Sequence, residues 1–258
     1  MVGEEKIQVK PKSANLGEVV IEINDLYKSF GSNDILKGVN LKVNKGENLV
    51  VLGKSGSGKS VTIKCLVGLV QADKGEIKVF GTDVTQLDNT QLNEIRPKIG
   101  FLFQNGALYD SMSVRENLAF TLRHHSKGIS AEELETEVVS ALENVGLADA
   151  IDKMPSELSG GMRKRIGLAR TLIIKPEIIL YDEPTTGLDS ITSREISELI
   201  LDIQKKYKTA SIIITHDMPC ARITSNRIVI LKEGVITAEG TYEELEKSED
   251  EWVRSFFI

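Results

Sequence analysis

The stretch GKSGSGKS, Gly53 to Ser60, decides how the rest of the chain is interpreted. It fits the phosphate-binding P-loop pattern, in which a glycine and four further residues precede Gly-Lys and then Ser or Thr. The preceding residues NLVVL, Asn48 to Leu52, predict a short buried strand, and Val61 to Leu69 predicts a helix with an apolar face. The sequence therefore has the order of strand, loop and helix that a phosphate-binding loop requires.

The residue types of this loop suit a nucleoside triphosphate and a magnesium ion. Its glycines allow backbone N–H groups to turn toward an anion at the start of the following helix. Lys59 adds a positive charge for the β and γ phosphates, and the Ser60 hydroxyl is a hard oxygen ligand of the kind that Mg²⁺ prefers. We therefore predict that the nucleotide is bound by Gly53, Lys54, Ser55, Gly56, Ser57, Gly58, Lys59, Ser60 and Val61.

Composition narrows the classes of partner. The chain has 258 residues, a formal net charge of −6 and 5% aromatic residues, which argues against a nucleic-acid partner because such proteins usually carry a basic face. Cys65 and Cys220 are too few for a disulfide framework, which suits a reducing compartment. No signal peptide and no run of about 20 apolar residues is evident, so we expect a partner to hold the protein at any membrane where it acts.

Patterns along the chain predict an α/β fold, a P-loop NTPase core with a mainly parallel sheet, an antiparallel β flap and an inserted helical lobe. Residues 1–17 are expected to be a flexible tail, residues 18–248 one ATPase domain, and residues 249–258 a short helix or tail. Short alternating strands over 19–43 and 76–80 predict the flap, and helical periodicity without strands predicts the lobe at about 105–165. Strands alternate with helices after residue 178, which is typical of a parallel sheet.

Two adjacent carboxylates end the predicted strand Ile178 to Tyr181. In P-loop ATPases the acidic residue at the end of this strand helps to hold Mg²⁺, a role that falls to Asp182. Glu183 is then placed to orient or deprotonate the water that attacks the γ-phosphate. A solvated acidic turn is the alternative, but carboxylates beside a buried strand are costly unless they are paired or bound to a metal.

Polar side chains also follow two other predicted core strands. His216 comes after the strand Ser211 to Thr215, and Gln104 closes the strand Lys98 to Phe103. Ligands of parallel sheets bind at the carboxyl ends of the strands, so His216 is expected at the γ-phosphate and Gln104 at Mg²⁺ or the attacking water. Either residue alone would be weak support for a site.

The stretch ELSGGMRKR, Glu157 to Arg165, adds a second anion site. Ser159 precedes two glycines at the start of a predicted helix, where it offers an N-cap hydroxyl and free N–H groups. One ATP does not need two such cradles. With this stretch the sequence resembles the ATP-binding cassette family, in which the LSGG signature of one subunit caps the nucleotide held by the P-loop of another.

The resemblance covers about Val19 to Tyr242 and implies an ATP hydrolase that binds ATP and Mg²⁺ as a homodimer. It implies catalytic roles for Glu183, His216 and Gln104, magnesium contacts from Ser60, Gln104 and Asp182, and contacts to the nucleotide of the other subunit from Ser159, Gly160 and Gly161. Phe30 matches the aromatic residue that stacks on adenine, with Tyr27 as the competing candidate. Leu188 and Asp189 match the D-loop.

Three long stretches resemble the ATPases of Mla or Mce-type phospholipid transporters: GKSGSGKSVTIKCLVGL, FLFQNGALYDSMSVRENLAF, and PSELSGGMRKRIGLARTLIIKPEIILYDEPTTGLDSITS. Met162 follows LSGG where most cassette ATPases have Gln. The resemblance implies a transport-coupled ATPase held at the cytoplasmic face of the inner membrane by an integral membrane permease, with lipid-binding accessory proteins as further partners. The permease is expected to dock at Asn105 to Met112, for which packing between lobes is the alternative.

Two other functions stay open on the sequence. One is a soluble cassette ATPase that acts without a permease as a scaffold, as in iron–sulfur cluster assembly. The other is a cassette ATPase for lipoproteins or small solutes. The basic cluster Arg163 to Arg165 is interpreted as a solvated face of a helix rather than as a nucleic-acid site.

Overall fold

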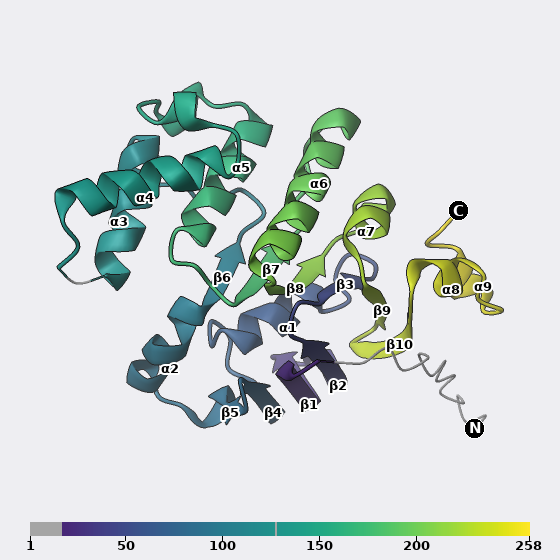
Figure 1. The fold of residues 1–258 in the computed structure, drawn as a ribbon. Coiled ribbons are helices and arrows are strands. Elements are labelled where there is room, and N and C mark those ends of the chain that lie inside the picture. Colours follow the sequence, from purple (N-terminus) through teal and green to yellow (C-terminus); the bar gives the residue numbers. More distant parts are fainter. Residues whose placement is uncertain (1–16, 127) are drawn as a thin grey trace.

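The computed structural model describes residues 17–126 and 128–258, so the predicted tail lies outside the described residues except for Gly17. The described chain forms two sheets, a six-stranded sheet of order β10-β9-β3-β8-β7-β6 and a four-stranded sheet of order β2-β1-β4-β5 (Figure 1). Strands β9, β3, β8, β7 and β6 run parallel, and β10 is antiparallel to β9. All pairings in the smaller sheet are antiparallel.

The bounds of the elements are as follows. The larger sheet contains β3 (Asn48–Leu52), β6 (Ile99–Leu102), β7 (Ile178–Asp182), β8 (Ala210–Ile214), β9 (Arg227–Lys232) and β10 (Val235–Gly240). The smaller sheet contains β1 (Val19–Phe30), β2 (Asn33–Asn44), β4 (Lys74–Val79) and β5 (Thr82–Asp83). The α-helices of the described residues are α1 (Lys59–Leu66), α2 (Asn89–Ile95), α3 (Val114–His125), α4 (Ala131–Glu143), α5 (Gly160–Leu172), α6 (Ser190–Tyr207), α7 (Met218–Thr224), α8 (Tyr242–Glu246) and α9 (Glu251–Arg254).

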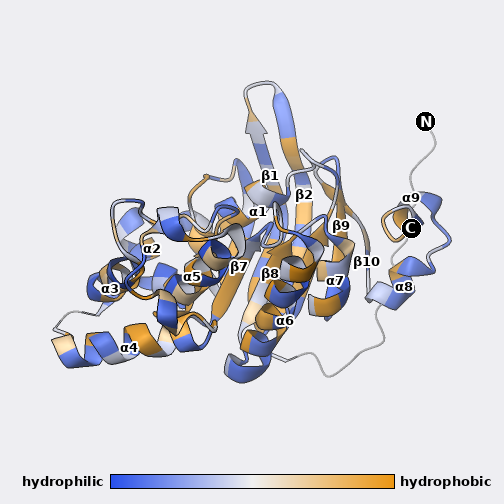
Figure 2. Cartoon of the chain, turned by 90° about the horizontal axis from the view of Figure 1, so that it is seen from above, coloured by the Kyte–Doolittle hydropathy of each residue, from blue (hydrophilic) through white to orange (hydrophobic). Residues whose placement is uncertain are grey.

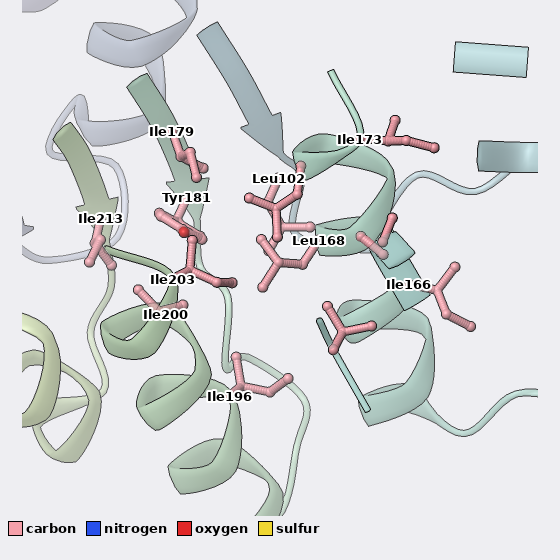
Figure 3. Packing of buried hydrophobic residues seen from close by; sticks show 14 of the residues in the cluster. Leu102, Ile166, Leu168, Ile173, Ile179, Tyr181, Ile196, Ile200, Ile203 and Ile213 are labelled. Atoms are coloured by element: carbon pink, nitrogen blue, oxygen red, sulfur yellow. The ribbon is translucent and has the colours of Figure 1, made fainter. Parts of the chain in front are cut away.

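The central strands β3, β7 and β8 are buried along their whole length and mainly apolar, because both faces of the sheet are covered. Successive residues point to opposite faces, so Val50 packs into one hydrophobic cluster while Leu49 and Val51 pack into another. One face meets helices α5 and α6, whose buried residues include Leu168 and Ile200 (Figure 3). The apolar strands and the inward faces of the helices are visible together in Figure 2.

The smaller sheet confirms the predicted antiparallel flap, although β1 and β2 each run for 12 residues where the sequence indicated shorter strands. A half-buried arginine ties the two sheets together. Arg227 of β9 donates through Nε to Glu47 Oε1 (2.7 Å) and through Nη2 to the backbone oxygen of Lys42 on β2 (2.5 Å). The flap is therefore fixed to the sheet that carries the P-loop.

Helices α3, α4 and α5 form a helical lobe beside the larger sheet (Figure 1). Helix α3 begins with a capping box of Ser113 and Glu116. Helix α5 continues to Leu172, so the boundary expected near Arg165 falls inside a helix.

Several boundaries differ from the sequence-based ones for local reasons. Helix α1 ends at Leu66 because Gly68, at φ 69°, turns the chain away. Strand β6 starts at Ile99 because residues 96–98, with Pro97, form a short 3₁₀ turn. Among the helices of the described residues, none is both long enough and apolar enough to cross a bilayer.

Candidate nucleotide site

The P-loop joins β3 to α1 in the conformation that an anion cradle needs. Gly58 is the N-cap of α1 at φ 106°, and a Cβ on it would lie 2.6 Å from Leu36 Cδ2, so the position admits only glycine. No side chain caps the first turn of α1, which leaves its N–H groups to a ligand. Lys59 Nζ donates to the backbone oxygens of Gly53 (2.8 Å) and Lys54 (3.1 Å).

The pKa of Lys59 is lowered by burial, and attraction to Glu183 and Asp182 opposes the shift. A phosphate group would supply further negative charge beside this ammonium. The loop therefore has the geometry and the charge for a nucleotide phosphate.

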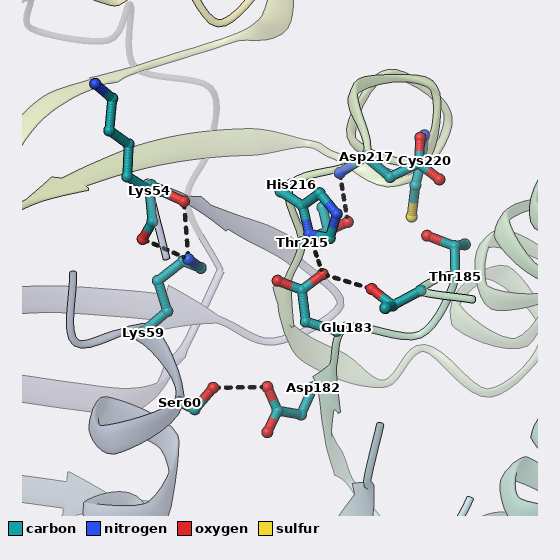
Figure 4. Close-up of polar contacts among 12 residues, drawn as sticks. Lys54, Lys59, Ser60, Asp182, Glu183, Thr185, Thr215, His216, Asp217 and Cys220 are labelled. Carbon is teal, nitrogen blue, oxygen red and sulfur yellow. Dashed lines mark hydrogen bonds and ion pairs between the residues drawn. The ribbon is translucent and has the colours of Figure 1, made fainter. Parts of the chain in front are cut away.

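Ser60 and Asp182 meet at the start of α1 and the end of β7. Ser60 Oγ donates to Asp182 Oδ1 at 2.8 Å (Figure 4). Within the described residues no group of three or more His, Cys, Asp or Glu side chains could hold a metal by itself. This pair of hard oxygens fits Mg²⁺, which is bound through one or two carboxylates together with substrate phosphates and water.

Glu183 lies next to Asp182 but its side chain takes a different direction. Its Oε2 lies 2.7 Å from His216 Nδ1 (Figure 4). The same oxygen accepts from Thr186 Oγ1 at 3.0 Å. Its backbone is left-handed, at φ 53°, and its N–H donates to the backbone oxygen of Ile214 at the end of β8 (2.9 Å). The turn after β7 therefore points the Asp182 carboxylate toward Ser60 and the Glu183 carboxylate toward His216.

A cavity of about 780 Å³ brings most of the predicted residues together. The predicted residues that line it are Phe30, Gly53, Lys54, Ser55, Gly56, Gly58, Lys59, Ser60, Val61, Gln104, Glu183 and His216. Asp182 is buried behind Ser60, and Ser57 is buried in the loop outside the lining. Gln104 and His216 each lie two residues beyond the end of their strand rather than directly at it.

Phe30 and Tyr27 are distinguished by position. Phe30 is 51% exposed and lines the cavity, whereas the Tyr27 hydroxyl lies against Gly38 and does not line it.

The cavity is also lined by three residues that the sequence did not predict: Ile35, Thr186 and Phe256. Thr186 lies three residues after Glu183, so its hydroxyl could have been predicted to contact that carboxylate. The sequence around Phe256 contains no pattern that indicates a contact with the P-loop cavity.

The signature residues lie apart from this cavity. Ser159 is the N-cap of α5, as the sequence predicts, and its Oγ accepts from the Met162 N–H at 3.2 Å. Gly161 packs on the start of α6, where a Cβ would lie 2.5 Å from Thr192 Cγ2. Ser159, Gly160 and Gly161 do not line the cavity of their own chain.

The interpretation of Arg163 to Arg165 as a solvated face is wrong for Lys164. Its side chain points into the protein and is 5% exposed, and Nζ donates to the backbone oxygen of Glu183 at 3.0 Å. Burial lowers the pKa of Lys164 to about 8, and attraction to Glu183 and Asp182 opposes this shift. Helical periodicity could have indicated the burial, because Lys164 lies three residues after the buried Gly161 and three before the buried Gly167.

This combination of P-loop, strand-end carboxylates and signature helix defines a P-loop ATPase of the cassette type. Residues 36–186 match the ABC transporter family, so the chain belongs to that family. It is accordingly an ATP hydrolase whose ligands are ATP and Mg²⁺.

Three relatives illustrate the breadth of the family around this chain. The "Probable ribonucleotide transport ATP-binding protein mkl" of Mycobacterium leprae is 42% identical over 92% of this chain and 68% of its own length. Protein TRIGALACTOSYLDIACYLGLYCEROL 3 of Arabidopsis thaliana is 40% identical over 94% of this chain and 74% of its own length. The methionine import ATP-binding protein MetN of Rhizobium etli is 38% identical over 90% of this chain and 64% of its own length.

A solved structure shares the fold closely. The ATP-binding cassette MJ0796, described as a dimeric post-hydrolysis state bound to ADP and Pi, matches with a TM-score of 0.79 at 33% identity. The match covers 86% of this chain and 98% of that one. It confirms the predicted fold class.

Proposed function

We propose that this chain is the ATPase subunit of a permease-coupled phospholipid transporter of the Mla or Mce type. Two copies bind two MgATP head to tail, and a permease holds them at the cytoplasmic face of the inner membrane. The observation that carries the proposal is the composite nature of the site. The cavity collects the P-loop, Glu183 and His216, but not the signature residues of the same chain.

The charged and polar residues in and beside the cavity have separate tasks in hydrolysis. Lys59 and the P-loop N–H groups bind the phosphates, and Ser60 and Asp182 hold Mg²⁺, which neutralises charge on the phosphate oxygens. Glu183 orients the attacking water and accepts its proton. His216 and Thr186, both bonded to Glu183 Oε2, fix the direction of that carboxylate.

The face that carries the signature supports a head-to-tail dimer. Ser159 and Gly160 are exposed, and Ile191 nearby at the start of α6 is 72% exposed, so this face is free to meet a second copy. A second copy would cover Ile191 and bring Ser159 to the nucleotide of the first. The dimeric state described for MJ0796 is consistent with this arrangement.

The helical lobe offers a surface for a permease. Tyr109 and Phe120 are each 46% exposed and pack edge to face, with ring centroids 5.3 Å apart. Phe120 also lines, together with Met112, a groove of about 430 Å³ between α3 and α4. Exposed aromatic side chains beside a groove suit an inserted helix. Leu108, in contrast, packs against the core, so Tyr109 and Phe120 form the better docking surface.

Phospholipid is favoured as cargo by the resemblance of three long stretches, Met162 included, to Mla and Mce-type ATPases. One relative is named for trigalactosyldiacylglycerol, which is a glycerolipid. The names of two others refer to ribonucleotide transport and methionine import. These relatives are named for different cargoes, so the cargo of this chain has to be tested on the whole complex.

The test is to purify the chain with its membrane partners, reconstitute the complex in liposomes and follow labelled phospholipid on addition of MgATP. We expect ATP-dependent lipid transfer that is lost in a complex carrying Glu183→Gln. Transfer of labelled methionine or ribonucleotide without lipid transfer would overturn the assignment of cargo. Co-purification with soluble proteins alone would instead support the scaffold function.

A further inference from the structure

Lys164 occupies a position that is costly for a lysine. Its side chain is 5% exposed, and lysine is almost never buried to this extent unless its ammonium has a partner. The partner is the neutral backbone oxygen of Glu183, 3.0 Å from Nζ, rather than a carboxylate. An apolar side chain would fill the same space without the free-energy cost of burying a charge. The ammonium therefore needs an explanation other than packing.

The residue that Lys164 contacts is held in an uncommon conformation. Glu183 has φ 53°, in the left-handed region, which is sterically unfavourable for a residue with a Cβ. Its N–H is tied to the backbone oxygen of Ile214, and its carbonyl is tied to Lys164. These two bonds fix the peptide units on both sides of the Cα that aims the carboxylate at His216.

We propose that Lys164 is a positioning residue for catalysis. Its ammonium holds the Glu183 carbonyl, which keeps the turn after β7 in the left-handed conformation that points the carboxylate into the cavity. This inference rests on the proposed role of Glu183 as the residue that activates water.

The position of Lys164 on α5 gives the contact a further consequence. The same helix begins at the signature residue Ser159, and its Arg170 donates to the backbone oxygens of Ala107 (2.6 Å) and Gly106 (3.3 Å) in the loop that follows Gln104. A movement of α5 therefore displaces the Glu183 carbonyl and the Gln104 loop together. The lysine makes the catalytic carboxylate sensitive to whatever the signature contacts.

The test compares Lys164→Met, which keeps the length of the side chain without its ammonium, with Lys164→Arg, which restores a charged donor. Both are made in the full chain and assayed for kcat and KM with MgATP. We expect Lys164→Met to lower kcat by about tenfold or more, with KM within about twofold, as for loss of an interaction made in the transition state. Lys164→Arg should recover most of the rate. Arg163→Met, an exposed neighbour on α5, serves as the matched control and should retain wild-type kcat.

A double variant shows whether Lys164 acts through Glu183. In the Glu183→Gln background, Lys164→Met should reduce the single-turnover rate no further. An equal loss in both backgrounds, a rise in KM alone, or an unchanged kcat in Lys164→Met would each overturn the proposal. If Lys164→Met does not fold by circular dichroism, Lys164→Leu, which also removes the ammonium donor, takes its place with the same readouts. Normal turnover by Glu183→Gln alone would instead refute the proposed role of Glu183.

Discussion

At the scale of single residues, Asp182 and Glu183 have different surroundings although they are neighbours in the chain. Asp182 ends β7 and is buried against the Ser60 hydroxyl, whereas Glu183 begins a left-handed turn toward His216. The first can hold Mg²⁺ and the second can reach a water molecule. The change of backbone conformation between them is what separates the two roles.

Replacing Glu183 by Gln tests this division of roles. The amide side chain would keep the size of the glutamate but could not accept a proton, so hydrolysis should fall by ~10²-fold or more, the range for loss of a general base. Binding of MgATP should remain, because the P-loop and Asp182 are unchanged. Steady-state turnover and equilibrium nucleotide binding are the two measurements.

Glu177→Gln is the matched control, since Glu177 is an exposed carboxylate that precedes the other end of β7. It should hydrolyse ATP at the wild-type rate. Near-normal turnover in Glu183→Gln, or loss of MgATP binding along with hydrolysis, would contradict the assignment.

Residues of the site differ in how far the sequence could predict them. Some site residues could be predicted because they lie in, or just after, a loop or strand that the neighbouring sequence identifies. These are Lys59, Ser60, Asp182 and His216. Lys164 and Phe256 could not, because their contacts with the Glu183 turn and the cavity depend on how distant segments pack. Their types, a lysine and a phenylalanine, are also common on surfaces and in cores.

At the scale of elements, the segment before α3 is held by one buried side chain. Asn117 is completely buried, and its Oδ1 accepts from the Tyr109 N–H at 2.7 Å. Its Nδ2 donates to the backbone oxygens of Tyr109 (3.1 Å) and Met112 (3.0 Å). These bonds satisfy backbone groups that no regular element pairs, and they fix Tyr109 beside Phe120.

We predict that Asn117→Leu detaches this segment. Each backbone group left unsatisfied in a buried site costs about 1–3 kcal/mol, so the thermal midpoint should fall. The affinity for the permease should fall by about tenfold or more, equivalent to about 1.4 kcal/mol, because the docking surface loses its shape. MgATP affinity should stay within about twofold of wild type, since the P-loop is untouched.

Thr121→Val is the control on the same helix, because it removes only a bond from Thr121 Oγ1 to the backbone oxygen of Asn117. It should bind the permease as wild type does. Unchanged permease binding by a folded Asn117→Leu variant would place the docking surface elsewhere.

The elements themselves were predictable to different degrees. The parallel strands were clear because burial on both faces makes them continuously apolar, as in Ile178 to Tyr181. Helix α2 was missed because Leu92 is its one buried residue in the structure, so its sequence NTQLNEI carries no apolar periodicity. Its signal is the capping box of Asp88 and Gln91.

At the scale of the whole molecule, one chain carries two surfaces that would each form half of a nucleotide site in a dimer. The flap, P-loop and strand ends form the cavity, and the signature lies on the helical lobe near the start of α6. Gly161 of the signature packs against Thr192 on α6, so the signature cannot reach the cavity of its own chain without loss of this packing. We therefore propose that two copies complete each other around ATP.

Light scattering on the isolated Glu183→Gln chain, with and without MgATP, tests this claim most directly. Slow hydrolysis keeps ATP in place, and a ligand shared across an interface stabilises the dimer by mass action. We predict that MgATP doubles the measured mass, that Ser159→Arg abolishes the shift, and that Ser140→Arg, at an exposed position of α4, leaves it intact. A chain that binds MgATP and stays monomeric, or a wild-type monomer whose specific activity does not depend on protein concentration, would contradict the account.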